Sequence, residues 1–98
     1  MIHVKILGNK SHLRYPVRRL VESARASLRT EYPDLQLDIQ EVSDMEEILR
    51  YTPVMMAPGL VIGERLVYDL WIPKKEQVVE WLKEAIREQS FRSGHSGS

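Results

Sequence analysis

The sequence contains no cysteine at any of its 98 positions. Disulfide bonds, thiol nucleophiles, cysteine-ligated zinc and iron–sulfur clusters all need at least one cysteine, so the composition excludes them together. The three histidines, His3, His12 and His95, are scattered along the chain without the spacing of metal ligands. We therefore expect neither a metal site nor a cofactor.

An excess of charge of one sign is also missing, because fourteen Lys and Arg residues balance fourteen Asp and Glu residues. A neutral domain has no overall field that attracts nucleic acid or an acidic membrane. The charges are nevertheless segregated, since residues 31–50 hold seven acids and one base, whereas residues 10–29 hold six bases and only Glu22 as an acid. The six bases are Lys10, Arg14, Arg18, Arg19, Arg25 and Arg29.

The basic segment fits a solvated helix face that pairs with the acidic segment of the same chain. A nucleic-acid interface is the weaker interpretation, because only Tyr15 offers a stacking ring near the basic side chains and the acidic segment would repel the same polymer. We expect no nucleic acid partner.

Long apolar runs are absent as well. No stretch approaches the roughly 18 apolar residues of a membrane-spanning helix, and the first residues lack the pattern of a secretory signal. We expect a cytoplasmic protein that does not bind membranes. The length suits a single domain, which we place at residues 1–90. Residues 91–98, which are small and polar after Phe91, suit a flexible tail or a remnant of cloning.

Hydrophobic periodicity predicts the elements of the first half. A short β-branched stretch predicts a buried strand at residues 2–7, and alternation of apolar and polar residues predicts a half-buried strand at residues 35–40. Between them, apolar residues at three- and four-residue spacing predict an amphipathic helix that ends near Thr30. We expect this helix to start at Pro16, because a proline beyond the first turn would disrupt a helix that began at Ser11.

A capping box predicts a short second helix. Ser43 and Glu46 have the spacing at which a hydroxyl and a carboxylate satisfy the free amides of a helix start. The buried side of this helix is expected to consist of Met45, Ile48 and Leu49.

The remaining pattern is that of a hairpin and a last helix. Residues 60–62 and 66–71 read as strands joined by the two-residue turn Gly63-Glu64, and Pro73 suits the first position of a helix. The predicted order is β-α-β-α-β-β-α, with a parallel pair and an antiparallel pair of strands in one sheet.

The last strand would form an edge of that sheet. If Leu66, Tyr68 and Leu70 face the core, Val67 and Trp71 remain on the other face beside unpaired backbone groups. Pairing with a second copy would make this edge a homodimer interface. The alternative is that the last helix, or the bend before Pro73, covers both residues.

Four short motifs occur in the order and spacing of a known family. They are Ile6-Leu7-Gly8, Val54-Met55-Met56-Ala57-Pro58, Leu60-Val61-Ile62-Gly63, and Ile72-Pro73 through Glu80-Trp81-Leu82. Over about residues 1–88 the chain resembles the thioredoxin fold, and more narrowly the small thioredoxin-like proteins known as redox-active disulfide proteins. The resemblance implies an α/β, thioredoxin-like domain with a four-stranded mixed sheet and three flanking helices.

The chain departs from the family where the chemistry lies. The family carries Cys-x-x-Cys at the start of the first helix, and counting from Gly8 places that pair at Ser11 and Arg14. Thiol–disulfide exchange needs a low-pKa thiolate and a second thiol, and neither a hydroxyl nor a guanidinium replaces them. We therefore expect a redox-inactive domain.

The resemblance also implies a cis peptide bond before Pro58 and a groove for an extended substrate. The candidate binding residues are Lys10, Ser11, His12, Arg14, Met56, Ala57 and Pro58.

We favour a module that binds a protein partner, or a second copy, through this groove or the sheet edge. The alternative is an enzyme or binder for a glutathione-like or other anionic small molecule at the Ser11–Arg14 helix start, where amides and Arg14 would hold a carboxylate or phosphate. A solvated helix start without a ligand is the simplest alternative.

Overall fold

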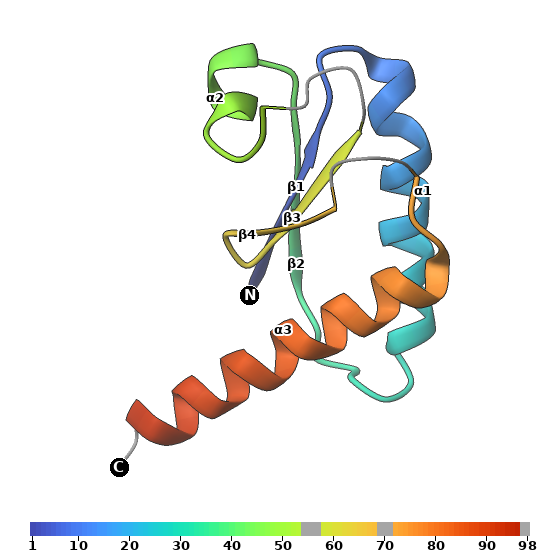
Figure 1. Ribbon diagram of the computed structural model, residues 1–98. Helices are drawn as coiled ribbons and strands as arrows, with labels where there is room; N and C mark the ends of the chain where they lie inside the picture. The colour runs from blue at the N-terminus through green and yellow to red at the C-terminus, as the bar shows by residue number, and fades with distance from the viewer. Residues whose placement is uncertain (54–57, 69–71, 97–98) are drawn as a thin grey trace.

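The computed structural model describes residues 1–53, 58–68 and 72–96. The described residues form the elements β1 (Ile2–Leu7), α1 (Ser11–Leu28), β2 (Leu37–Val42), α2 (Met45–Leu49), β3 (Gly59–Ile62), β4 (Arg65–Tyr68) and α3 (Lys75–Ser96), as Figure 1 shows. The sheet order is β2-β1-β3-β4, with β1 parallel to β2 and the other pairs antiparallel. The predicted element order and the mixed sheet are confirmed.

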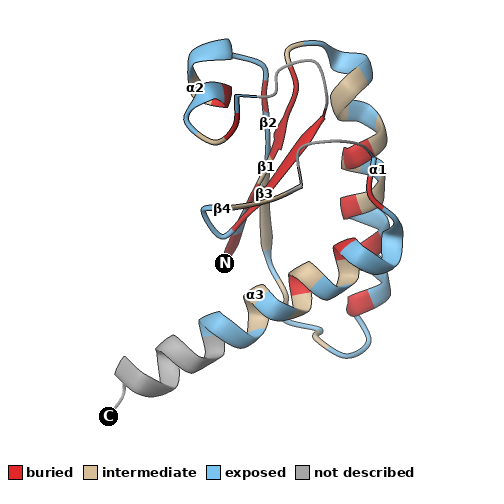
Figure 2. Ribbon diagram, in the orientation of Figure 1, coloured by how far each residue is buried: buried red, intermediate tan, exposed pale blue. Residues whose placement is uncertain are grey.

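The main hydrophobic core lies on the face of the sheet that α1 and α3 cover. Alternate residues of β1 enter it, and on α1 the buried side chains recur every three or four residues along the side that faces the sheet (Figure 2). The buried residues from these elements are Ile2, Val4 and Ile6 of β1, Val17, Val21, Ala24 and Leu28 of α1, and Val78 and Leu82 of α3.

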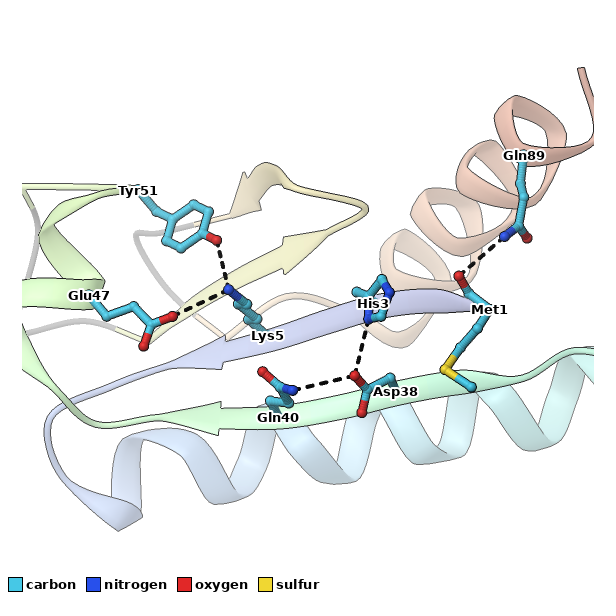
Figure 3. A network of polar contacts seen from close by, with 8 residues as sticks. All are labelled: Met1, His3, Lys5, Asp38, Gln40, Glu47, Tyr51 and Gln89. Atoms are coloured by element: carbon cyan, nitrogen blue, oxygen red, sulfur yellow. Dashed lines mark hydrogen bonds and ion pairs between the residues drawn. The ribbon is translucent and has the colours of Figure 1, made fainter. Parts of the chain in front are cut away.

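The opposite face of the sheet carries α2 over a smaller core of Leu7, Val42, Ile48 and Val61. Lys5 ties α2 to β1 there: its Nζ donates to the Tyr51 hydroxyl at 3.0 Å and to Glu47 Oε1 at 3.3 Å (Figure 3). The Tyr51 and Glu47 bonds raise the pKa of Lys5.

Polar side chains occupy this same face farther along the strands. His3 Nδ1 lies 3.1 Å from Asp38 Oδ2, which also accepts a hydrogen bond from Gln40 Nε2 at 3.4 Å (Figure 3). The sheet therefore has one apolar face under α1 and α3, and one face that is apolar only beneath α2.

The first helix begins at Ser11, so the predicted start at Pro16 is wrong. Pro16 lies inside α1 and has no N–H to donate to the carbonyl of His12, a defect that costs about 3 kcal/mol in a helix interior. Contacts of Arg14 with the sheet hold this first turn in place, as described below. Such tertiary contacts are not visible in local sequence periodicity.

The capping box is also wrong. Asp44 is the N-cap of α2 and makes no side-chain cap bond, and of the three apolar side chains only Ile48 is buried. Met45 is 49% exposed and Leu49 53% exposed, because a helix of five residues presents a single side to the sheet.

The second strand lies slightly later than predicted. It runs to Val42, whose carbonyl accepts a hydrogen bond from the Gly8 N–H at 3.0 Å and so extends the pairing with β1. Glu41 is therefore part of β2, from which its carboxylate reaches Arg14 and Arg18 of α1.

The position of β4 at the sheet edge is confirmed, but Val67 does not lie on an uncovered face. An irregularity in the pairing of β3 and β4 sets Leu66 opposite Val61 in the smaller core and turns Val67 toward the main core beneath α3. Trp71 lies outside the described residues. The homodimer at this edge stays a prediction.

The last helix starts at Lys75 rather than at Pro73, which is buried. The Lys74 N–H donates to Gln77 Oε1 at 3.0 Å and the Lys74 carbonyl accepts from the Val78 N–H at 3.2 Å, so Lys74 caps the helix and Lys75 is its first residue. The helix continues to Ser96 and so covers most of the segment 91–98 that we expected to be an irregular tail. The domain limit at residue 90 stays a prediction.

The turn between β3 and β4 yields a first prediction. Gly63 and Glu64 have φ angles of +58° and +67°, as a two-residue hairpin turn requires. An added Cβ at Gly63 would contact nothing within 4 Å, so Gly63→Ala introduces only backbone strain. We expect it to lower the free energy of unfolding by about 1 kcal/mol in urea denaturation. Glu64→Asn is the matched control and should cause no such loss, because Asn tolerates the left-handed region. A Gly63→Ala domain as stable as the original would contradict this account of the turn.

Candidate functional site

The predicted site residues that the structure describes lie at one end of the sheet. The chain leaves β1 at Gly8 and enters α1 at Ser11, and the register sets Leu7 opposite Gly59, so Pro58 lies at the same end. Pro58 is buried. Met56, Ala57 and therefore the peptide bond before Pro58 lie outside the described residues, and its cis geometry stays a prediction.

Arg14 is bonded within the fold through two of its nitrogens. Its Nη1 donates to the carbonyl oxygen of Gly8 at 2.8 Å, and its Nε donates to Glu41 Oε1 at 3.0 Å. The side chain is only 16% exposed. A Cβ at Gly8 would lie 3.0 Å from Arg14 Cγ, so glycine leaves the space in which the arginine passes over the end of β1.

Glu41 joins Arg14 to a second arginine of α1. Its Oε2 accepts a hydrogen bond from Arg18 Nη1 at 2.6 Å, and Arg18 Nε also reaches Glu22 at 3.2 Å. Arg14 and then Arg18 hold the pKa of the Glu41 carboxyl below its usual value, while Glu41 and then Glu22 raise the pKa of Arg18. We call these four residues the Arg14–Glu41 cluster. Arg14 and Arg18 of the basic helix face therefore pair with Glu41 of the acidic segment, as expected.

Lys10, Ser11 and His12 are exposed around the start of α1. The first turn of the helix contains no acidic residue, and Lys10 adds a positive charge beside it. The Leu13 N–H donates to the Lys10 carbonyl at 3.1 Å, so the amides that point out of the helix end are those of Ser11 and His12. This turn is therefore an accessible, electropositive surface. Arg14, which we expected to act as a bidentate anion donor, is occupied by Gly8 and Glu41 instead.

Sequence reasoning missed a groove of about 720 Å³ between α1 and the segment that leads into α3. Its lining includes Tyr15-Pro16 and Ile72-Pro73, in each of which an exposed apolar side chain precedes a proline. This repeated pair of an apolar residue and a proline is the sequence feature that could have indicated the groove. Within the described ranges, no three His, Asp or Glu side chains gather as metal ligands would, and no helix is both long and apolar enough to cross a bilayer.

Comparison with known proteins agrees with the element order and the sheet topology. The family model described as a thioredoxin domain matches residues 3–83, which is most of the chain. The chain belongs to the thioredoxin domain family. No curated protein and no solved structure matches it significantly. In this thioredoxin-family domain, the positions that the resemblance gives to the cysteine pair hold the exposed Ser11 and the bonded Arg14.

Glu41 gives a pH-dependent prediction. Its folded-state pKa lies below the ordinary value of 4.5, so its stabilisation is complete above that pH and is lost as the pH falls through the folded pKa. We expect Glu41→Gln to lower the free energy of unfolding by about 1 kcal/mol at neutral pH. The difference from the original protein should shrink as the pH is lowered from neutral into the acid range.

The matched control is Glu22→Gln, because Glu22 contacts only Arg18 within this cluster and is more exposed. It should change the stability by less than Glu41→Gln does. Urea unfolding followed across the pH range measures both. A Glu41→Gln effect that is the same at every pH would show that the ion pairs contribute nothing.

Proposed function

We propose that this thioredoxin-family domain is a redox-inactive binding module that recognises a protein segment at the start of α1, beside Pro58. The observation that carries the proposal is the set of hydrogen bonds made by the residue at position 14. Arg14 stands where the resemblance puts the second cysteine, and it is bonded to Gly8 and Glu41. A guanidinium held in this way stabilises the turn but forms no covalent bond with a substrate, which favours non-covalent recognition on a retained scaffold.

The surface chemistry supports a partner with carboxylate or backbone carbonyl groups. Lys10, Ser11 and His12 are exposed, the first turn of α1 has no acid, and the amides of Ser11 and His12 point out of the helix end. A segment in this place would hydrogen-bond to the turn without displacing Glu41 from Arg14. The module would work without a cofactor, and the cytoplasm stays its proposed location.

A small anionic ligand at the same turn is the second candidate. The lack of acidic residues around Lys10 and Ser11 favours it. The engagement of Arg14 argues against it, since a glutathione-like carboxylate or a phosphate would have to compete with Glu41 for the strongest donor. Protein recognition is therefore the better-supported function.

The test is selection of a displayed library of random peptides on the full chain, followed by titration of the selected peptides into isotope-labelled protein. We expect amide shifts at residues 8–14. Lys10→Ala should weaken binding about fivefold, the effect of losing about 1 kcal/mol. Lys83→Ala, which removes a positive charge on α3, is the matched control and should leave binding unchanged.

Parallel titrations with glutathione and with phosphate separate the two candidates. Shifts at residues 8–14 with millimolar glutathione or phosphate, but with no selected peptide, would replace the protein-binding function by the small-anion function. No shift at these residues with any of the probes would overturn both.

A further inference from the structure

The groove between α1 and the segment leading into α3 is apolar inside. We call it the α1–α3 groove, and its lining residues used below are Tyr15, Arg19, Leu20, Ile72, Lys74 and Lys75. Tyr15 is 60% exposed and Ile72 is 42% exposed, while Leu20 is partly buried between them and the core. Large apolar side chains exposed on both sides of a groove favour an apolar occupant.

The rim of the α1–α3 groove is positively charged. Arg19, Lys74 and Lys75 are exposed there, and Glu76 is the only acid in the lining. The guanidinium of Arg19 lies over the Tyr15 ring, with Cζ 5.7 Å from the ring centre. The groove therefore suits an occupant that combines apolar side chains with carboxylates.

The chain carries such a surface on α2. Met45 and Leu49 are four residues apart, so they lie on the same side of the helix, and both are about half exposed. Asp44 and Glu46 are exposed next to them. We call Asp44, Met45, Glu46 and Leu49 the α2 ridge.

Two contacts fix the orientation of the α2 ridge. Ile48 is buried in the smaller core, and Glu47 is held by Lys5 at 3.3 Å. These residues turn the opposite side of α2 outward. The ridge is thus presented by the fold rather than by a freely moving loop.

The α2 ridge and the α1–α3 groove lie on opposite faces of the sheet (Figure 1), so they cannot meet within one copy. We infer that the α2 ridge of one copy docks into the α1–α3 groove of a second copy. Met45 and Leu49 enter between Tyr15 and Ile72, and the carboxylates of Asp44 and Glu46 face Arg19, Lys74 and Lys75.

This contact joins different surfaces of two copies, so it is head-to-tail. Each pair keeps one free groove and one free ridge, to which further copies can add. The contact area is small and its charges lie at the rim, so association is weak and is reduced by salt. The inference uses surfaces other than the start of α1 and does not rest on the proposed binding function.

Sedimentation velocity on the full chain tests self-association from about 10 μM to about 1 mM at low salt, the range in which weak contacts of a few kcal/mol are populated. The weight-average sedimentation coefficient should rise with concentration and fall again with added salt. The ridge variant Met45→Asp/Leu49→Asp and the groove variant Tyr15→Ala/Ile72→Asp should each stay monomeric. Each of the four side chains is at least 42% exposed, and circular dichroism checks that both variants remain folded.

A mixture of the two variants is the decisive experiment. The ridge variant has an intact groove and the groove variant has an intact ridge, so an equimolar mixture should form a heterodimer that does not grow further. A monomeric protein at every concentration would overturn the inference. Self-association that neither variant weakens would also overturn it and would indicate an interface at the β4 edge. A mixture of the two variants that stays monomeric would overturn it as well.

Discussion

The guanidinium of Arg14 connects three parts of the fold that are far apart in the chain. It binds the carbonyl of Gly8 at the end of β1 and the carboxylate of Glu41 in β2, and it belongs to the first turn of α1. That turn would otherwise be the weakest part of the helix, because Pro16 donates no amide hydrogen bond to His12. The contact therefore explains how a helix with an internal proline begins five positions ahead of it. Arg14 therefore has a structural role at a position where the family resemblance predicts a redox-active cysteine.

Ion pairs within the fold determine which charged side chains stay free to meet a partner. Arg14 and Arg18 are satisfied by Glu41, and Glu47 is satisfied by Lys5 on the other face of the sheet. Among the charges that stay exposed are those of the positive helix start, the positive rim of the α1–α3 groove, and Asp44 and Glu46 on α2. The neutral net charge is therefore compatible with local positive and negative surfaces on one molecule.

The sequence was sufficient for the element order, the mixed sheet and the family, because alternation in the strands, helical periodicity in α1 and α3, and the ordered motifs all agree. It was insufficient where one distant contact decides the local structure. Arg14 and Glu41 are 27 positions apart, and nothing in the local pattern around Pro16 indicates that the two residues meet. Val67 was misplaced for a similar reason, since an irregularity in the pairing of β3 and β4 changes which residues face the core. The α1–α3 groove was missed because its two sides, at residues 15–23 and 72–76, come from segments at least 49 positions apart in the chain.

Amide hydrogen exchange of the first turns of α1 tests most directly whether Arg14 holds the helix start. The comparison is between the original chain and Arg14→Met, which keeps an unbranched apolar side chain but removes both hydrogen bonds. The account predicts that the amides of Tyr15, Val17 and Arg18 exchange about tenfold faster in the variant, while those of residues 21–28 keep their rates. Equal exchange rates at Tyr15, Val17 and Arg18 in the two proteins would contradict it.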